Sequence, residues 1–480
     1  MPTTLVWFRQ DLRLADNPAL HAAVARGAVL PVYVVDDATP GRWAWGGASR
    51  WWLRRSLEAL ARDLEARGSR LVLAAGDPLE ALFELAARAE ADAVVWNRCY
   101  EPHATARDRA VKTGLRARGL EVASYNGALL FEPWTVATGA GEPYKVYTPF
   151  ARACFRSQPP PRPLPVPERW TSPKVASTIT LPAIHDDRMT TDWTNGLVAA
   201  WTPGETSALE ALSAFLEDKV ANYGDNRNRP DLVGTSRLSP HLHWGELSPR
   251  QAWHATLARS GEGDAPAAGS GHETFVKELL WREFGYHILY HFPNLPTAPL
   301  KDAFRDFPWA SDKSNRNAWR FGRTGYPIVD AGMRELRTTG WMHNRVRMIA
   351  GSFLVKHLLE DWQHGASWFW DNLVDADLAS NTLGWQWVAG CGPDAAPYFR
   401  VFNPVLQGQK FDPDGAYVRR WVPELAEVPT PDLHAPWEAR DEVLAKAGVR
   451  LGETYPKPVV AHKPARQRAL DAFDRIKRQG

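Results

Sequence analysis

The sequence has little cysteine and no long apolar run. Its three cysteines, Cys99, Cys154 and Cys391, lie far apart in a chain of 480 residues and form no Cys-x-x-Cys pair. Within this chain they exclude a disulfide framework, a zinc ribbon and a four-cysteine iron–sulfur cluster. No uncharged segment approaches the length of a membrane span, and residues 1–9 are too short and mixed for a signal peptide. We therefore expect a cytoplasmic protein.

The chain also has almost no net charge. Lys and Arg total 57 and Asp and Glu total 55, so the formal charge is +2, and any surface for a polyanion must be local. The common nucleotide-binding and hydrolase motifs are missing: there is no G-x-x-x-x-G-K-[ST], no G-x-S-x-G, and no G-x-G-x-x-G after the first apolar run. Hydrophobic residues make up 44% and charged residues 23%, which excludes disorder of the whole chain.

Tryptophan, in contrast, is abundant. The chain has 23 Trp, against 18 Phe and 12 Tyr. Indole is large and needs a partner for its N–H group when it is buried. We expect most of these residues in the core. The faces of a subset are suited to stacking an unpaired base, or to relaying electrons, because indole is readily oxidised.

Residues 1–130 alternate short apolar runs with helical patterns. The expected strands are 4–8, 29–35, 70–73, 93–96 and 120–123, and the expected helices are 49–68, 77–91 and 104–118. This alternation predicts an α/β domain with a doubly wound, parallel, five-stranded sheet. Ligands on such sheets bind at the carboxyl ends of the strands.

The rest of the chain divides into two further parts. Residues 131–200 are rich in proline, which breaks regular structure, and we expect a long linker that wraps over the surface. Residues 201–480 are helical in pattern, with expected helices at 206–223, 272–290, 327–336 and 345–362 and no convincing strand. The last twenty residues predict a basic, solvated helix. The fold class is therefore α/β plus all-α.

Several polar motifs in the helical part have both a functional and a structural interpretation. Thr235 to Ser239 combine three hydroxyls with an arginine, which suits an anion such as a pyrophosphate or a simple helix cap. Asp375-Ala376-Asp377 suits a metal pair, a solvated loop or a cofactor contact. His241-x-His243 has no acidic or cysteine partner at ligand spacing, so we expect no metal site.

Collinear segments spread over almost the whole chain resemble the DNA photolyase and cryptochrome family. They are residues 5–20, 234–240, 279–284, 325–330, 340–347, 375–381 and 394–404. The resemblance implies an α/β antenna domain, a wrapping linker and an all-helical domain in which folded FAD binds without a dinucleotide fingerprint. The missing phosphate loops are thereby explained.

The resemblance also implies which residues hold FAD. Those matching the phosphate contacts are Tyr223, Thr235, Ser236, Arg237, Leu238 and Ser239, and Glu278, Arg282 and Asn344 also match cofactor positions. Arg347 matches the arginine paired with Asp375 beside the isoalloxazine. Asp377 matches a ligand of the ring edge, and Asn381 matches the position that faces flavin N5.

Asn381 favours repair over light sensing. Photolyases usually carry Asn at this position, plant cryptochromes Asp and animal cryptochromes Cys. A neutral amide stabilises the fully reduced flavin that repair needs, whereas an ionised Asp has no proton to donate. The lack of a long tail after Gly480 points the same way. The alternative is a cryptochrome-type blue-light receptor without repair, and a plain flavin oxidoreductase is disfavoured because nothing indicates a nicotinamide site.

The resemblance further implies the lesion, a cyclobutane pyrimidine dimer, as in photolyases of class I or class III. The residues that match are Glu278, Trp281, Asn344, Met348 and Trp387, and the His pair of (6-4) enzymes is absent near Asn344. Trp281 and Trp387 form two aromatic walls for the flipped dimer. A protonated Glu278, its pKa raised by burial, stabilises the transient anion of the thymine carbonyl.

In the implied mechanism, excited FADH⁻ donates an electron to the dimer, the ring splits and the electron returns. Trp385, Trp362 and Trp309 match the chain that photoreduces oxidised FAD. The residues that match DNA contacts are Arg227, Arg282, Arg345 and Gln407. We expect contacts mainly to phosphates, so that affinity depends on salt and not on the DNA sequence. We expect a monomer, and a preference for single-stranded DNA stays open.

The antenna chromophore of the family is methenyltetrahydrofolate or 8-hydroxy-deazaflavin. One folate-binding subgroup has an Asn-Glu pair after the fourth strand, which residues 100–105 lack, but Glu101 is placed to meet a pterin ring. Residues 43–52 resemble those of proteobacterial members that use folate. We expect methenyltetrahydrofolate, with the deazaflavin as the alternative.

Overall fold

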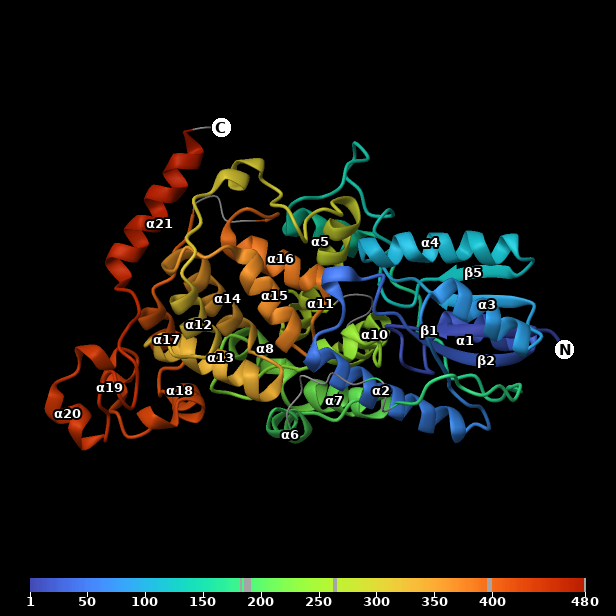
Figure 1. Ribbon diagram of the computed structural model, residues 1–480, viewed down its shortest axis with the longest axis horizontal. Coiled ribbons are helices and arrows are strands. Elements are labelled where there is room, and N and C mark those ends of the chain that lie inside the picture. The colour runs from blue at the N-terminus through green and yellow to red at the C-terminus, as the bar shows by residue number, and fades with distance from the viewer. Residues whose placement is uncertain (182–183, 185–190, 262–265, 395–398, 479–480) are drawn as a thin grey trace.

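The computed structural model describes residues 1–181, 184, 191–261, 266–394 and 399–478. The α/β part lies at the end that carries the N-terminus, and the helical part extends to the opposite end (Figure 1). The sheet comprises β1 (Thr3–Phe8), β2 (Ala28–Val35), β3 (Val72–Ala75), β4 (Ala93–Asn97) and β5 (Glu121–Tyr125). All neighbouring strands are parallel, in the order β3-β2-β1-β4-β5. The predicted five-stranded doubly wound sheet is confirmed.

The sequence explains these elements locally. β1 is buried almost throughout, as in a parallel sheet covered on both faces. The covering helices are α1 (Pro18–Arg26), α2 (Gly47–Glu65), α3 (Pro78–Arg88) and α4 (Pro102–Ala117). Asn17 and Asp77 cap α1 and α3 through their side chains, each followed by proline at the first helical position. Because the strand order reverses between β1 and β4, their carboxyl ends form the expected ligand-binding edge.

The linker contains two helices, so the prediction of an irregular segment over 131–200 was wrong in part. They are α5 (Tyr147–Arg156) and α6 (Thr191–Ala200). Pro149 is compatible with α5 because it lies in the first turn, where no intrahelical N–H bond is lost. Part of the linker after α5 lies against the α/β part, where the amides of Asp16 and Val29 donate to the carbonyls of Leu164 and Thr171, at 2.8 Å each.

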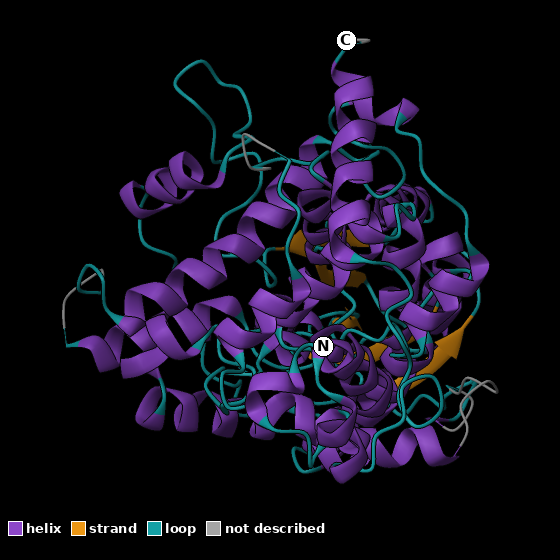
Figure 2. Cartoon of the chain, turned by 90° about the vertical axis from the view of Figure 1, so that its left-hand side faces the viewer, coloured by secondary structure: helices purple, strands orange, loops and turns teal. Residues whose placement is uncertain are grey.

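The rest of the described chain is helical (Figure 2). After β5 the described residues contain no strand, only isolated bridges between Ala310 and Glu360 and between Leu451 and Tyr455. None of their helices is both long and apolar enough to cross a membrane. The helices are α7 (Glu205–Asp218), α8 (Tyr223–Asn226), α9 (Ser239–His243), α10 (Pro249–Ser260), α11 (Gly271–His291), α12 (Lys313–Arg320), α13 (Pro327–Thr339), α14 (Asn344–Ser352), α15 (Trp362–Asn372), α16 (Leu378–Ala389), α17 (Pro404–Phe411), α18 (Ala416–Trp421), α19 (Thr430–Leu433), α20 (Asp441–Lys446) and α21 (His462–Lys477).

Two predicted helices are interrupted in the structure. The segment 206–223 ends as α7 at Asp218, and α8 begins only after a short 3-10 turn. The segment 345–362 divides into α14, a π-helical turn at Phe353–His357, and α15. Leu359 adopts a left-handed conformation with φ 55°, and the Asp361 side chain caps α15. The apolar periodicity continues across this break, which is why it did not reveal the interruption.

Buried polar contacts join the α/β part to the helical part. The Arg13 guanidinium, 1% exposed, donates to the carbonyls of Gly245, Asp16 and Gly127 at 2.6–2.8 Å. Glu205 at the start of α7 accepts from the amides of Leu14 and Ala15. These hydrogen bonds therefore hold the strand ends against the helical part.

Candidate functional site

The start of α16 gathers three of the predicted flavin residues. Asp377 caps the helix by accepting from the Ser380 amide at 2.7 Å. Arg347 on α14 reaches Asp375 with its Nη2 atom 2.8 Å from Oδ2. One turn into α16, Asn381 donates from Nδ2 to the Ala366 carbonyl at 3.1 Å, so its amide is held in one orientation.

Asp377 is a buried carboxylate with several donors. Tyr286 donates its hydroxyl to Oδ2, and the Nδ1 atom of His243 lies 3.6 Å from the same oxygen. Burial raises the pKa of Asp377, but His243, Arg282 and Tyr286 outweigh it, so the net shift is downward. The carboxylate therefore stays ionised and suits a donor on a cofactor ring.

Arg237 lies in the loop before α9 with a left-handed φ of 53°. Its guanidinium carbon lies 4.1 Å from the centre of the Trp201 ring and 5.1 Å from that of Trp341. The Trp341 indole N–H donates to the Ser239 hydroxyl at 3.3 Å. The Arg237 guanidinium thus lies against two aromatic rings.

The residues fit a large polar cofactor. Arg237 Nε, His243 Nε2, His343 Nε2 and Arg345 Nε are buried without a hydrogen-bond partner, which is uncommon in native proteins. Burial, together with Arg345 and Arg347, lowers the pKa of His343 to about 4, so this imidazole is neutral. Unpartnered buried nitrogens of this kind match the need of a diphosphate for hydrogen-bond donors.

The predicted lesion residues lie on α11 and α14. Glu278 has Oε1 2.6 Å from Arg227 Nη1, and burial raises the pKa of Glu278 although Arg227 opposes the shift. Trp281, one turn later, is half-buried. Asn344 and Met348 lie on one side of α14, with Asn344 exposed.

Trp387 lies on α16, which packs against α11. The two helices meet at Gly285, where a Cβ would lie in van der Waals contact 3.6 Å from the backbone carbon of Ala379. Trp387 also lines a cavity of about 70 Å³ together with Lys356 and Phe399. The two predicted aromatic walls therefore belong to adjacent helices.

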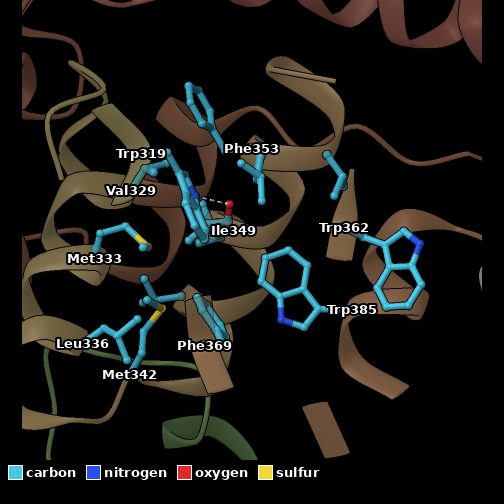
Figure 3. Packing of buried hydrophobic residues seen from close by; sticks show 14 of the residues in the cluster. Trp319, Val329, Met333, Leu336, Met342, Ile349, Phe353, Trp362, Phe369 and Trp385 are labelled. Carbon is cyan, nitrogen blue, oxygen red and sulfur yellow. Dashed lines mark hydrogen bonds between the residues drawn. The ribbon is translucent and has the colours of Figure 1, made fainter. Parts of the chain in front are cut away.

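Two of the three predicted electron-transfer tryptophans are buried and the third is half-buried. Trp385 and Trp362 are buried at 4% and 3% exposure, and Trp309 is half-buried. Figure 3 shows the indoles of Trp385 and Trp362 in the buried core. The Trp385 indole lies against Gly365, one turn after Trp362, where a Cβ would come 2.1 Å from Cη2. The Ala310 amide donates to the Leu359 carbonyl at 2.7 Å, which places Trp309 beside the segment that leads to Trp362.

The predicted DNA contacts fall into two groups. Arg227, Arg345 and Gln407 are partly exposed, and Arg345 joins two segments by bonding Asn228 and lying 4.5 Å from the Phe411 ring centre. Arg282 points inward instead, where its guanidinium donates to the carbonyls of Ala128 and Leu242.

A second pocket lies at the carboxyl ends of the strands. It is a cavity of about 50 Å³ whose lining includes Tyr33, Glu101, His103, Arg107 and Trp45. Glu101 accepts from Gln10 Nε2 at 2.9 Å, while its other oxygen is buried without a partner. Trp45 stacks on Trp370 at 5.6 Å and 14° and lies 4.9 Å from Trp244.

No group of three His, Cys, Asp or Glu side chains in the described residues is arranged to hold a metal ion. His241 instead lies 2.5 Å from Glu246 through its Nδ1 atom, and that carboxylate also accepts from the Trp52 indole at 3.1 Å. These contacts give His241 a role in the junction of the two parts.

Sequence reasoning missed residues whose partners are distant in the chain. Tyr286 contacts Asp377 from 91 residues away, and Tyr147 stacks on Trp281 from within the linker. The position of Tyr286 on α11, two turns after Glu278, is a usable signal. Nothing in the local spacing distinguishes Tyr147 from other linker aromatics.

The sheet, the helical part and the groups of predicted flavin and lesion residues define a flavin-binding protein of the photolyase and cryptochrome class. A sequence model described as the FAD binding domain of DNA photolyase matches residues 275–475, and one described as DNA photolyase matches residues 4–168. The crystal structure of a bacterial class III photolyase from Agrobacterium tumefaciens has a TM-score of 0.95 at 50% identity, covering 100% of this chain and 98% of that chain.

Two curated relatives agree with this assignment. The deoxyribodipyrimidine photo-lyase of Agrobacterium fabrum is 49% identical over 482 residues, covering 99% of this chain and 98% of the relative. Cryptochrome-1 of Arabidopsis thaliana is 40% identical over 480 residues, covering 98% of this chain and 70% of the relative. The chain belongs to the DNA photolyase family, which confirms the predicted family, fold class and FAD-binding domain.

Proposed function

We propose that this protein repairs cyclobutane pyrimidine dimers in DNA in a light-dependent reaction. The observation that carries the proposal over a photoreceptor is Asn381, a neutral amide fixed by Ala366 one turn from the buried carboxylate of Asp377. The 49%-identical photo-lyase supports the same reaction.

FAD would be held by residues of α8, α14 and α16 and of the loop before α9. Tyr223 and the loop from Thr235 to Ser239 would contact the diphosphate, while the Arg347–Asp375 pair, Asp377 and Asn381 would hold the isoalloxazine. Bound FAD, when fully reduced and excited by light, supplies the electron for repair. The inward-pointing Arg282 contributes to the electrostatics of Asp377, so we assign it to the cofactor side of the site.

At the lesion, each side chain has one task. Trp281 and Trp387 stack on the flipped bases in place of their lost neighbours, with Asn344 and Met348 beside them. Burial raises the pKa of Glu278, and in its protonated form this residue would donate a hydrogen bond to the thymine carbonyl as negative charge develops there.

DNA binding rests on Arg227, Arg345 and Gln407. Contacts of this kind neutralise phosphates and release counterions, so affinity falls as salt rises and depends little on sequence. We expect the protein to act as a monomer in the cytoplasm, associated with the nucleoid while bound to DNA.

Trp385, Trp362 and Trp309 would return oxidised FAD to the reduced state. Trp385 and Trp362 are buried and Trp309 is half-buried, so an electron from an external reductant would enter at Trp309.

The antenna chromophore would occupy the pocket at the strand ends. The partnerless oxygen of Glu101 suits an N–H donor on a pterin ring, and the indole of Trp45 offers a stacking surface. We infer methenyltetrahydrofolate, with 8-hydroxy-deazaflavin as the alternative. The absorption spectrum of the purified protein and the identity of the chromophore released by acid distinguish the two.

The decisive experiment is repair of a single thymine dimer in a defined oligonucleotide by the reduced protein, in light and in the dark. We expect restoration of the thymines in light only. A protein that binds and photoreduces FAD but repairs neither duplex nor single-stranded substrate is a photoreceptor, and the proposal then fails.

A further inference from the structure

Trp281 is covered on one face by a residue of the linker. Tyr147, the first residue of α5, stacks on the indole with ring centres 3.6 Å apart and an angle of 7° between the planes. Tyr147 is 8% exposed, whereas Trp281 is half-buried. Trp281 therefore has one face against protein, and the remaining exposure belongs to the rest of the side chain.

Three further contacts fix Tyr147 itself. Its hydroxyl donates to the Lys277 carbonyl at 2.7 Å, and its amide donates to Asp394 Oδ1 at 3.2 Å. Its ring meets Phe284 edge-on at 6.0 Å and 73°. The Lys277 contact ties the tyrosine to the turn of α11 that carries Glu278 and Trp281.

The Asp394 contact reaches the segment after the other predicted wall. Asp394 follows α16, the helix of Trp387, and its own amide donates to the Lys145 carbonyl at 3.1 Å. Two hydrogen bonds thus join the start of α5 to this segment. A single stretch of linker therefore contacts Trp281 directly. It also contacts the segment that follows the helix of Trp387.

We propose that Tyr147 is a positioning residue for the lesion site, which holds the Trp281 ring in the orientation that receives the dimer. This inference rests on the proposed function, in which Trp281 is an aromatic wall. An unsupported indole samples several rotamers, and ordering it on binding weakens affinity. Tyr147 removes that cost, because its flat contact holds the ring before the lesion arrives.

A purely structural role makes a different prediction. Phe150 lies on the same helix and packs against Phe284 at 5.3 Å and His287 at 5.0 Å. If Tyr147 only filled the core, truncating either residue would lower stability and leave lesion recognition unchanged.

The test compares Tyr147→Phe, Tyr147→Leu and Phe150→Leu with the unmodified holoenzyme. Binding in the dark is measured to an oligonucleotide with one thymine dimer and to the same sequence undamaged, together with repair per bound lesion in a single flash. We expect Tyr147→Leu to weaken lesion binding about five-fold, the effect of one lost aromatic stack, with undamaged binding and repair per bound lesion unchanged. Tyr147→Phe keeps the stack and stays within about two-fold of the unmodified protein.

Three outcomes overturn the proposal: lesion affinity of Tyr147→Leu equal to that of the unmodified protein, equal losses in Tyr147→Leu and Phe150→Leu, or a loss in Tyr147→Phe as large as in Tyr147→Leu. If Tyr147→Leu does not fold, Tyr147→Met carries the same expectation, because its flexible side chain fills the space without a flat face. Failure of the proposed function is distinct, since the unmodified protein itself then shows no preference for the lesion.

Discussion

The two ends of the molecule build their candidate sites in different ways. In the α/β part, the pocket forms where β1, β2 and β4 end, so the topology of the sheet brings its residues together. In the helical part, the flavin and lesion residues come from α8, α9, α11, α14 and α16 and from a linker helix. The first site follows from strand order, whereas the second depends on individual side-chain contacts. Mutations should therefore have larger and more specific effects at the second.

The largest effect is expected for Asn381→Asp. A carboxylate at this position places negative charge beside the reduced flavin and removes the amide donor, so repair should fall by about 100-fold. The measurement is repair of a thymine dimer by pre-reduced protein, with the flavin redox state followed by absorbance.

Asn372→Asp is the matched control for this change. Asn372 also donates from Nδ2 to a helix carbonyl, that of Trp368 at 2.9 Å, but it has no predicted flavin contact. Equal losses of repair in the two variants would show that the added charge acts through folding, and Asn381 would lose its assigned role.

The next effect is expected for Trp309→Phe. Phenylalanine is much harder to oxidise than tryptophan, so photoreduction of oxidised FAD should slow by about 10-fold, an added barrier of about 1.4 kcal/mol, while pre-reduced protein repairs normally. Trp437→Phe is the control, because Trp437 is half-buried and packs on Tyr326 at 5.0 Å, away from Trp385. Unchanged photoreduction in Trp309→Phe would show that electrons do not reach FAD through Trp309.

The same contrast explains what the sequence could predict. Short apolar runs and helical patterns locate all five strands and α2, α3 and α4, because these elements depend on local burial. The Arg347–Asp375 and Glu278–Trp281 sets came from motif resemblance, since contacts between separate helices leave no periodic trace. The break at Leu359 and the contact of Tyr147 were not predictable, because both depend on packing between segments distant in the chain.

A smaller effect is expected when the pH is changed, because the repair rate should depend on the protonation of Glu278. Only its protonated form donates to the thymine carbonyl, and burial raises the pKa of Glu278. Repair should therefore be full at low pH and fall as pH rises through this raised pKa. Glu278→Gln keeps a donor at every pH, so its profile should be flat, with a rate within about 10-fold of the unmodified protein. An unchanged, sloping profile in Glu278→Gln would assign the titration to another group.

The smallest effect is expected at the α/β pocket, with Glu101→Ala. Losing the carboxylate removes one hydrogen bond to the proposed chromophore, worth about 1 kcal/mol or about five-fold in affinity. Chromophore content should fall by that order, and repair should slow only in dim light, because the flavin absorbs enough on its own when light is saturating. Glu80→Ala, in the first turn of α3 and paired with Arg118, is the control and should match the unmodified protein in dim and in saturating light. If Glu101→Ala lost repair equally in dim and bright light, this carboxylate would act on the flavin part as well, and the separation drawn between the two ends of the molecule would not hold.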